Sequence, residues 1–435
     1  MPEFKLPSPK RTTRDDRAAH DGRPAAFTLT RDHGWWWVLT PDGQRLFTVG
    51  VNHLGSLTDP GAAERVARAF GCPAEQLWDR VTQHLTDLGC NTIGYHAPDA
   101  LRTALPYFAD TTQHHAMHCA PGPSFGYPDV FDPAEQQRIA DAVRAACEAH
   151  RGRPNLIGYF WTDTPRWNLD TARRERATDW VTTLRRLGPD APGKRAYVDF
   201  LRETYANDAV EFARTYRLNL TSFDDLPAHD FAYQELTWPA VRRDDEAFLA
   251  RIADTLYRTT ADAFHHHDPG RLLFSERYKS HDHHDGVLLA AAKYIDVLSI
   301  QDGPEVGPMP GPGKHESAFD ADYYNRLHEL TGKPVLICDH NVSFKTESHP
   351  VTLWHACDTA DQAAELNADY LRAAAATPYI LGYGRCQYLS VFDPQRRLLK
   401  QGLLDEDGTP YPTSNDAFTR ATSDALAHRQ ALAQS

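Results

Sequence analysis

Apolar runs typical of buried β-strands recur along this chain and alternate with segments in which apolar residues repeat every three or four positions. The strand-like runs are residues 46–52, 91–96, 156–161, 272–278, 294–300, 333–340 and 379–389. The helical segments include residues 75–88, 133–150, 244–267 and 359–375. Such repetition predicts parallel strands joined by right-handed crossovers. We therefore expect an α/β fold, a single (β/α)8 TIM barrel of about eight strands rather than a doubly wound sheet.

Three parts of the chain stand outside this alternation. Residues 1–26 are charged and contain prolines, which predicts a polar N-terminal extension ahead of one catalytic domain over residues 27–435. The stretch FTLTRDHGWWWVLTPDGQRLF begins that domain with short β-like runs around a Pro-Asp-Gly turn, and we expect this β-lead to close the bottom of the barrel. The segment from about 166 to 238 is too long for an ordinary crossover, so it predicts a helical insertion over the barrel mouth.

Composition excludes several classes of protein. The chain has 435 residues, 41% of them hydrophobic, and can bury a large core. Its net charge of -13 comes from 59 acidic and 46 basic residues spread along the chain, which argues against nucleic acid as a partner. Apolar runs stay well short of the roughly 20 residues that cross a bilayer, and the first residues lack the apolar stretch of a secretion signal. We expect a cytoplasmic protein with no membrane partner, unless a leader has been removed.

The sequence indicates no cofactor. Its seven cysteines are widely spaced without a CxxC pair, so free thiols are expected rather than a structural zinc site. Neither GxGxxG nor GxxxxGK[ST] occurs, which weakens a nucleotide-binding interpretation.

Polar and aromatic side chains interrupt or follow the predicted strands, where the working residues of such barrels lie. They are Asn52, His53, Tyr95, His96, Trp161, Asp163, Trp167, Glu276, Arg277, Gln301, Asp302, Asp339, His340, Gln387 and Tyr388. Carboxylates on four strands, beside basic and aromatic groups, suit a site that holds a polyhydroxylated ligand and breaks a bond with an acid and a base. A sugar is the natural substrate of this arrangement, since aromatic faces stack on sugar rings.

An ordered set of words in this chain resembles the exo-β-agarases of glycoside hydrolase family 50 and their relatives in clan A. The words are GWWWVLTPDGQRLFTVGVN, FGYPDVFDP, NLIGYFWTDTPRW, SFDDL, SERY, AAKYIDVLSI, GKPVLICDH, CQY and GTPYP, and they cover nearly the whole chain from Gly34. The resemblance implies a (β/α)8 hydrolase of β-linked, galactose-containing chains. It also implies an acid/base residue on barrel strand four and a nucleophile on strand seven.

The chain departs from the family at both catalytic positions. Where family members have an Asn-Glu pair after the GYF strand, this chain has Asp163 and Thr164, so the acid/base glutamate is missing. On strand seven, where the family has Glu in a KPVLIGE-like word, this chain has Asp339.

Three hypotheses account for this departure. In the first, Asp163 donates the proton and Asp339 acts as nucleophile or base; two short side chains would widen the gap between the carboxyl groups and slightly favour inversion. In the second, Glu276 or Asp302 supplies the second carboxylate and Asp163 orients substrate hydroxyls. In the third, the chain binds sugar without cleaving it.

Several residues have structural alternatives. Asp163 could cap its loop ahead of Pro165. Asp339 could pair with Lys333 or an arginine. His340 could be a buried core histidine, and Arg277 is expected to position a carboxylate rather than to meet substrate charge.

Two further sequence features suggest ligands but have simpler explanations. Trp35, Trp36 and Trp37 fit core packing better than a sugar platform. The histidine-rich stretches 265–267 and 281–285 fit a solvated surface better than a metal site.

The sequence thus predicts a glycoside hydrolase that cleaves an O-glycosidic bond of a small oligosaccharide or glycoside, with a galactose-containing sugar as one candidate. Exo action is expected because the large domain that agarases commonly carry ahead of the barrel is absent from this sequence. The alternatives are a non-catalytic sugar-binding barrel and a metal-dependent lyase or isomerase on the same fold.

Overall fold

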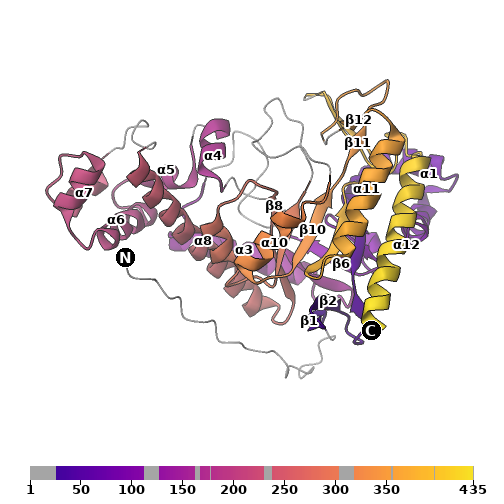
Figure 1. Cartoon of the computed structure of the whole chain (residues 1–435), viewed down its shortest axis with the longest axis horizontal. Helices are drawn as coiled ribbons and strands as arrows, with labels where there is room; N and C mark the ends of the chain where they lie inside the picture. The colour runs from indigo at the N-terminus through magenta and orange to yellow at the C-terminus, as the bar shows by residue number, and fades with distance from the viewer. Residues whose placement is uncertain are drawn as a thin grey trace.

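Eight parallel strands close into a barrel with helices around it (Figure 1). The computed structural model describes residues 26–111, 127–161, 167–176, 178–229, 238–302, 318–353, 356–395 and 397–434. The barrel strands, in spatial order, are β10 (Val335–His340), β13 (Ile380–Arg385), β4 (Thr48–Val51), β5 (Thr92–Ile93), β6 (Tyr107–Asp110), β7 (Leu156–Phe160), β8 (Leu272–Lys279) and β9 (Val297–Gln301). This closed parallel barrel confirms the predicted (β/α)8 fold.

The helices of the described chain include every segment that the periodicity predicted. They are α1 (Pro60–Ala69), α2 (Leu77–Asp87), α3 (Pro133–Ala149), α4 (Leu169–Arg176), α5 (Trp180–Arg185), α6 (Pro192–Thr204), α7 (Ala209–Tyr216), α8 (Pro239–His267), α9 (Asp285–Ala291), α10 (Ala321–Thr331), α11 (Ala360–Ala375) and α12 (Pro412–Gln434). Short 3-10 turns span Leu54–Thr58, Ala74–Gln76, Asp99–Leu101 and Phe223–Ala228. Helix α3 begins with an Asp-Pro pair, in which the Asp132 carboxylate caps the helix by accepting a hydrogen bond from Ala134 N at 2.9 Å.

Side chains of the barrel strands point alternately inward and outward, which divides the core in two. One cluster fills the barrel and includes Phe108, Phe160, Phe274, Leu336 and Cys338. A larger cluster fills the layer between the strands and the surrounding helices. Near the carboxyl ends of the strands, a side chain that points inward can therefore reach the barrel mouth, whereas one that points outward packs against the helices.

The β-lead closes one end of the barrel, as the sequence predicted. It is a three-stranded sheet of β1 (Thr28–Asp32), β2 (Trp35–Leu39) and β3 (Arg45–Leu46). Phe27 and Val38 pack against the inward-facing residues, and Trp37 is buried. In Figure 1 this sheet lies at the lower end of the barrel, beside the end of α12.

The long segment after β7 forms a helical insertion that extends to one side of the barrel (Figure 1). Helices α4 to α7 belong to it, and its buried residues Trp180, Tyr197 and Phe212 join the same hydrophobic cluster as the outer layer of the barrel. A buried ion-pair network anchors it, since Asp245 of α8 bonds both Arg173, at 2.9 Å, and Arg185. The insertion and the barrel therefore share one core.

Two small two-stranded sheets, the first parallel and the second an antiparallel hairpin, lie near the carboxyl ends of β10 and β13. They are β11 (Ser343–Phe344) with β12 (Ala356–Cys357), and β14 (Val391–Asp393) with β15 (Leu398–Lys400). The second hairpin brings Lys400 to the barrel mouth, next to residues at the end of β4.

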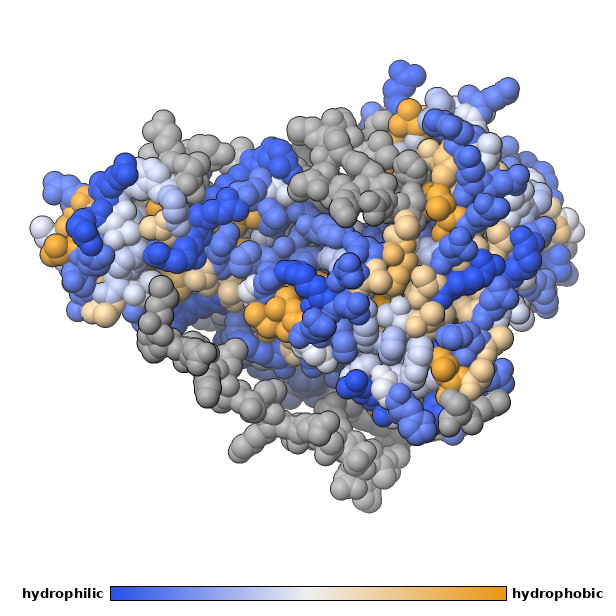
Figure 2. Space-filling model, in the orientation of Figure 1, coloured by the Kyte–Doolittle hydropathy of each residue, from blue (hydrophilic) through white to orange (hydrophobic). Residues whose placement is uncertain are grey.

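On the face drawn in Figure 2, the hydrophobic residues that carry colour lie in small groups among hydrophilic ones. The helices of the described chain are too short or too polar to cross a bilayer.

Candidate functional site

Asp339 lies at the carboxyl end of β10, and its carboxylate is held by one residue of β8 and one that follows β4. Arg277 of β8 donates a hydrogen bond from Nη1 to Asp339 Oδ2 at 2.8 Å. Asn52, which follows β4, donates from Nδ2 to the other carboxylate oxygen and also to the carbonyl of Cys338. Only 2% of Asp339 is exposed. Arg277 thus contacts Asp339, a carboxylate that the sequence analysis offered as its partner.

The surroundings of Asp339 keep its carboxyl group ionised. Burial alone would raise the pKa of Asp339, but the nearby His53 ring and the charges of Arg277 and Lys400 outweigh that effect and hold the pKa well below its ordinary value. His53 Nε2 lies 3.9 Å from Asp339 Oδ2, too far for a hydrogen bond. Asp339 is therefore suited to be a nucleophile or a general base and cannot act as a proton donor near neutral pH.

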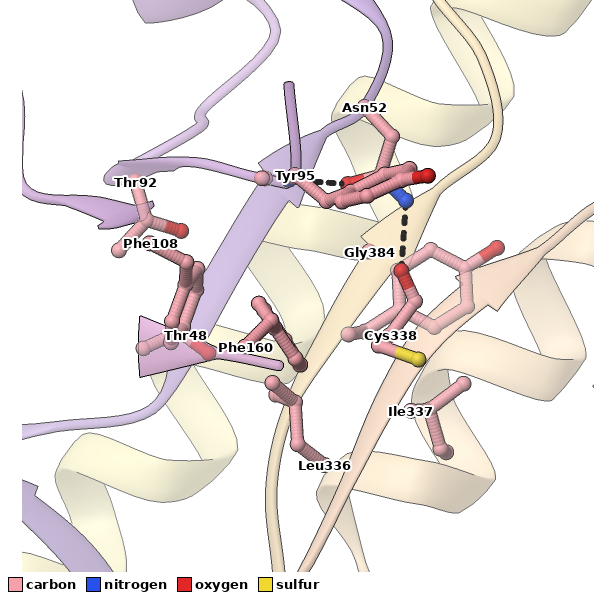
Figure 3. A pocket seen from close by; sticks show the side chains of 13 residues that line it. Thr48, Asn52, Thr92, Tyr95, Phe108, Phe160, Leu336, Ile337, Cys338 and Gly384 are labelled. Atoms are coloured by element: carbon pink, nitrogen blue, oxygen red, sulfur yellow. Dashed lines mark hydrogen bonds between the residues drawn. The ribbon is translucent and has the colours of Figure 1, made fainter. Parts of the chain in front are cut away.

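Tyr95 and His96 follow β5 and complete the wall beside Asp339. The guanidinium of Arg277 lies over the Tyr95 ring, 3.3 Å from its centroid, and donates to its hydroxyl group. The ring of Tyr95 stacks on that of His96, with centroids 3.7 Å apart. In Figure 3 the Tyr95 ring lies beside the Asn52 amide, whose oxygen accepts a hydrogen bond from Tyr95 N at 3.0 Å.

The protonation of the two histidines follows from their partners. Lys400 Nζ lies 2.9 Å from His53 Nε2, and an ammonium group can only donate, so this nitrogen must accept. His53 then carries its proton on Nδ1 and donates it to His96 Nδ1, 3.0 Å away. Burial, together with the charge of Lys400, lowers the pKa of His53 to about 3, so the ring is neutral at pH 7.

A pocket of about 420 Å³ opens beside this group. Its lining includes His53, Ser56, His96, Gln387 and Lys400, together with Leu353, Val391, Asp393 and Leu398. Pockets that hold small ligands start at roughly 300 Å³, so this one is large enough for a sugar ring.

The barrel interior below the mouth offers no such space. Figure 3 shows Phe108, Phe160 and Leu336 filling it, and the gap that remains among the lining residues is about 10 Å³, enough for at most one water molecule. A ligand must therefore bind at the mouth.

Glu276 lies on the other side of β8 from Arg277. A register shift in β8 falls between Phe274 and Arg277, and the Glu276 side chain turns toward α8. There Glu276 Oε2 accepts hydrogen bonds from Trp167 Nε1, at 3.1 Å, and from the Tyr257 hydroxyl group. Burial raises the pKa of Glu276 to about 7. The Glu276 side chain therefore lies in the layer between the strands and the helices, whereas Asp339 lies at the barrel mouth.

Two more predicted residues lie in the outer layer. His340 stacks on Tyr370 of α11, with ring centroids 3.7 Å apart, and its Nδ1 lies 2.8 Å from the Tyr383 hydroxyl group. Asp302 accepts hydrogen bonds from the hydroxyl groups of Tyr324, at 3.0 Å, and Tyr370. His340 is the last residue of β10 and Asp302 follows β9, both in the register that faces the helices. The contacts match the buried alternative for His340.

The remaining predicted residues are divided between the mouth and the core. Gln387 lines the pocket, and Gln301 donates from Nε2 to the carbonyl of Arg277 at 2.9 Å.

Trp161 and Trp167 are fully buried, and their rings pack on those of Tyr257 and Trp180 respectively. Their faces therefore contact other side chains and are not open to a sugar ring. Tyr388 is buried too and bonds His84 at 2.9 Å. Asp163, one half of the predicted catalytic pair, lies outside the described residues.

Ligand atoms of His53, Asp339 and Cys386 lie within 4.8 Å of one another, a group with metal-binding chemistry. The charges weigh against a divalent cation there, because Arg277 already pairs with Asp339 and Lys400 lies against His53 Nε2. Burial also raises the pKa of the Cys386 thiol, which keeps it protonated and a poor ligand.

Sequence reasoning missed Lys400 as a site residue. It lies in a short polar hairpin beyond the last barrel strand, and nothing in the run LLK marks it. The signal that could have found it is its place in the segment that follows barrel strand eight, since such loops build the mouth.

The barrel is similar to solved structures of several carbohydrate-active enzymes. An exo-β-agarase structure matches with a TM-score of 0.78 and 16% sequence identity, over 94% of this chain and 66% of the agarase chain. A second agarase matches with a TM-score of 0.77 and 17% identity, over 94% and 66% of the two chains. A β-galactosidase from the psychrophilic Marinomonas ef1 matches at 0.58 and 12%, over 89% and 60%.

These likenesses establish the fold. The chain spans 66% of the length of each agarase chain, just under two thirds. Scans against protein-family models and against curated proteins both give no match. The chain therefore has the (β/α)8 fold of the agarase structures, and its activity has to be argued from its own site.

Proposed function

We propose that this chain is a glycoside hydrolase that cleaves an O-glycosidic bond of a small oligosaccharide or glycoside, with exo action and a galactose-containing substrate as the starting hypothesis. The observation that carries the proposal is Asp339, a buried and ionised carboxylate fixed by Arg277 and Asn52 at the mouth of the barrel. The agarases and the β-galactosidase with the same fold support the choice of substrate class by analogy.

The charge state of Asp339 assigns the roles. Glycoside hydrolysis needs one carboxylate and one protonated carboxyl group on opposite sides of the bond. Asp339 is ionised, so it is the nucleophile or the base, and another residue must donate the proton. Counted from β4, β10 is the seventh barrel strand, where the sequence resemblance put the nucleophile.

Asp163 is our candidate for the proton donor. It follows Trp161 at the end of β7, which is the fourth strand on the same count, where the resemblance put the acid/base residue. Glu276 has a raised pKa but contacts Tyr257 and Trp167 on the helix side of β8, so its position does not favour this role.

The test is hydrolysis of a panel of aryl glycosides by Asp339→Asn and Asp163→Asn variants. Removal of a general acid or base typically costs about 10²–10⁴ in rate, and we expect both variants to lose at least that much kcat/KM. Asp254→Asn, at a carboxylate that pairs with Lys293 away from the mouth, is the matched control and should keep its activity.

Two results would count against the proposal. Near-normal rates for both site variants of an active enzyme would remove Asp339 and Asp163 from the mechanism. Sugar binding without hydrolysis of any glycoside would favour a non-catalytic sugar-binding barrel.

A further inference from the structure

Lys400 is a cation at the barrel mouth without an acidic partner of its own. Among the described residues, His53 is the hydrogen-bond partner of Lys400 Nζ, and carboxylate oxygens stay more than 4.0 Å away from it. Two other lysines of this protein are neutralised, since Lys293 pairs with Asp254 at 2.7 Å and Lys345 with Asp358 at 2.5 Å.

The charges around Asp339 do not balance. Arg277 forms the direct ion pair with Asp339, at 2.8 Å, and already neutralises its single negative charge. Lys400 adds a second positive charge, while His53 between them is neutral. The described group of Asp339, Arg277, Lys400 and His53 thus carries one net positive charge.

The same lysine lines the 420 Å³ pocket, together with His53 and His96. An ammonium group has three N–H donors, and the contact with His53 uses one of them. Asp393 is the acidic residue of the lining, and its Oδ1 is engaged by Gln395 N at 2.9 Å. Asp393 keeps its negative charge but lies more than 4.0 Å from Lys400 Nζ, so the positive end of the pocket is at Lys400. There the pocket offers an anion two further N–H donors and the charge of Lys400.

We propose that the sugar bound in this pocket carries an anionic substituent, a carboxylate or a sulfate ester, that pairs with Lys400. This inference deepens the proposed function and rests on it for the identity of the site. A neutral sugar would leave Lys400 partly buried without a counter-charge, whereas an anionic one would gain a charge-assisted hydrogen bond.

The test is equilibrium binding, by calorimetry, of three free monosaccharides: galactose, galacturonic acid and galactose 6-sulfate. A hydrogen bond to a charged group is worth about 1.5–3 kcal/mol, which corresponds to about 10- to 100-fold in Kd. We expect one of the anionic sugars to bind the native protein at least about 10-fold more tightly than galactose, and the tighter of the two identifies the substituent.

Variants assign this preference to Lys400. In the native protein the Kd of galactose, divided by that of the preferred anionic sugar, measures the preference. Lys400→Met should reduce this ratio to about one, and Lys400→Gln, which retains a donor for His53, should do the same. Lys293→Met, at an exposed lysine just after the end of α9, is the matched control and should retain the native ratio.

Native protein that binds galactose as tightly as both anionic sugars would overturn the proposal. So would Lys400 variants that keep the full preference. Because binding is measured without turnover, failure of the proposed hydrolysis would appear separately, as a preference for the anionic sugar with no cleavage of any glycoside.

Discussion

Adjacent residues at the end of β8 have opposite environments, and this decides their chemistry. Arg277 faces the mouth and pairs with Asp339, whereas Glu276 faces α8 and is bonded by Tyr257 and Trp167. The two carboxyl groups are shifted in opposite directions: burial raises the pKa of Glu276, while cations hold that of Asp339 down. A sequence shows two neighbouring polar residues, but the register shift that separates them appears only in the fold.

Glu276 gives a pH dependence of stability that can be measured. Its pKa is raised from 4.5 to about 7, so the folded state keeps a proton that the unfolded chain releases. The contribution of Glu276 to the free energy of unfolding is fully present below about pH 4.5 and is lost as the pH rises through about 7. The free energy of unfolding changes by about 3 kcal/mol over this range. Glu276→Gln retains the neutral form, so its stability relative to the native protein should rise by about that amount between pH 4 and pH 8.

Urea unfolding of both proteins at the two pH values checks this prediction. Glu148→Gln, at a half-exposed glutamate of α3, is the control and should show no such change. Equal pH dependence in native protein and Glu276→Gln would mean that Glu276 titrates normally. Loss of all hydrolysis in a stable Glu276→Gln variant would return Glu276 to the catalytic site.

Much of the candidate site could be predicted residue by residue because polar groups at strand ends stand out from apolar runs. Asn52, His53, Tyr95, His96, Arg277 and Asp339 were found in this way, and the structure brings them together. His340 and Asp302 have the same sequence signal but face the helices, because the side-chain period of a strand separates the two faces by one residue. Lys400 was missed because it comes from a hairpin outside the barrel strands, where only its place after barrel strand eight indicates a role at the mouth.

At the scale of elements, the periodic segments were predictable and the short ones were not. Strand β6 has four residues, follows a proline and was missed, because its run is too brief to show a period. Helix α8 begins at Pro239, before the predicted 244, and packs its buried residues over most of its length. Within the tryptophan triplet, Trp37 is buried as interpreted and its two neighbours are partly buried. Arg429 of α12, which lies over the rings of Trp35 and Trp37, is distant in sequence.

Arg429 ties α12 to the closed end of the barrel. Its guanidinium donates to the carbonyls of Thr377, at 2.8 Å, and Ile380, and lies 4.7 Å from the centroid of the Trp35 ring. Arg429→Met keeps the apolar contacts but leaves those carbonyls unpaired, so we expect a loss of about 2–4 kcal/mol in the free energy of unfolding.

Chemical denaturation at pH 7 measures this loss. Arg420→Met, at an exposed position of the same helix, controls for helix propensity and should change stability by less than about 0.5 kcal/mol. An Arg429→Met variant as stable as this control would show that α12 is held by its apolar face alone.

At the scale of the whole molecule, the barrel carries a site whose charges set it apart from a plain sugar cleft. The chain as a whole has a net charge of -13, yet the described groups nearest to Asp339 are cationic or neutral. A negative surface around a positive site keeps the attraction for an anionic ligand local, since charges beyond about 8–10 Å are screened at physiological salt. The fold forms the barrel mouth, and the cationic and neutral side chains around Asp339 determine the chemistry of the site.

The central claim is that Asp339 flanks the bond that is cleaved, and a crystal structure with a bound non-hydrolysable thioglycoside tests it most directly. The account predicts that an Asp339 oxygen faces the anomeric carbon, about 3–3.5 Å from it if Asp339 is the nucleophile, or with one water molecule between them if Asp339 is the base. The Asp163 carboxyl group should lie on the opposite side of the glycosidic sulfur. A sugar bound at another part of the mouth, with Asp339 still enclosed by Arg277 and Asn52 and out of its reach, would contradict it.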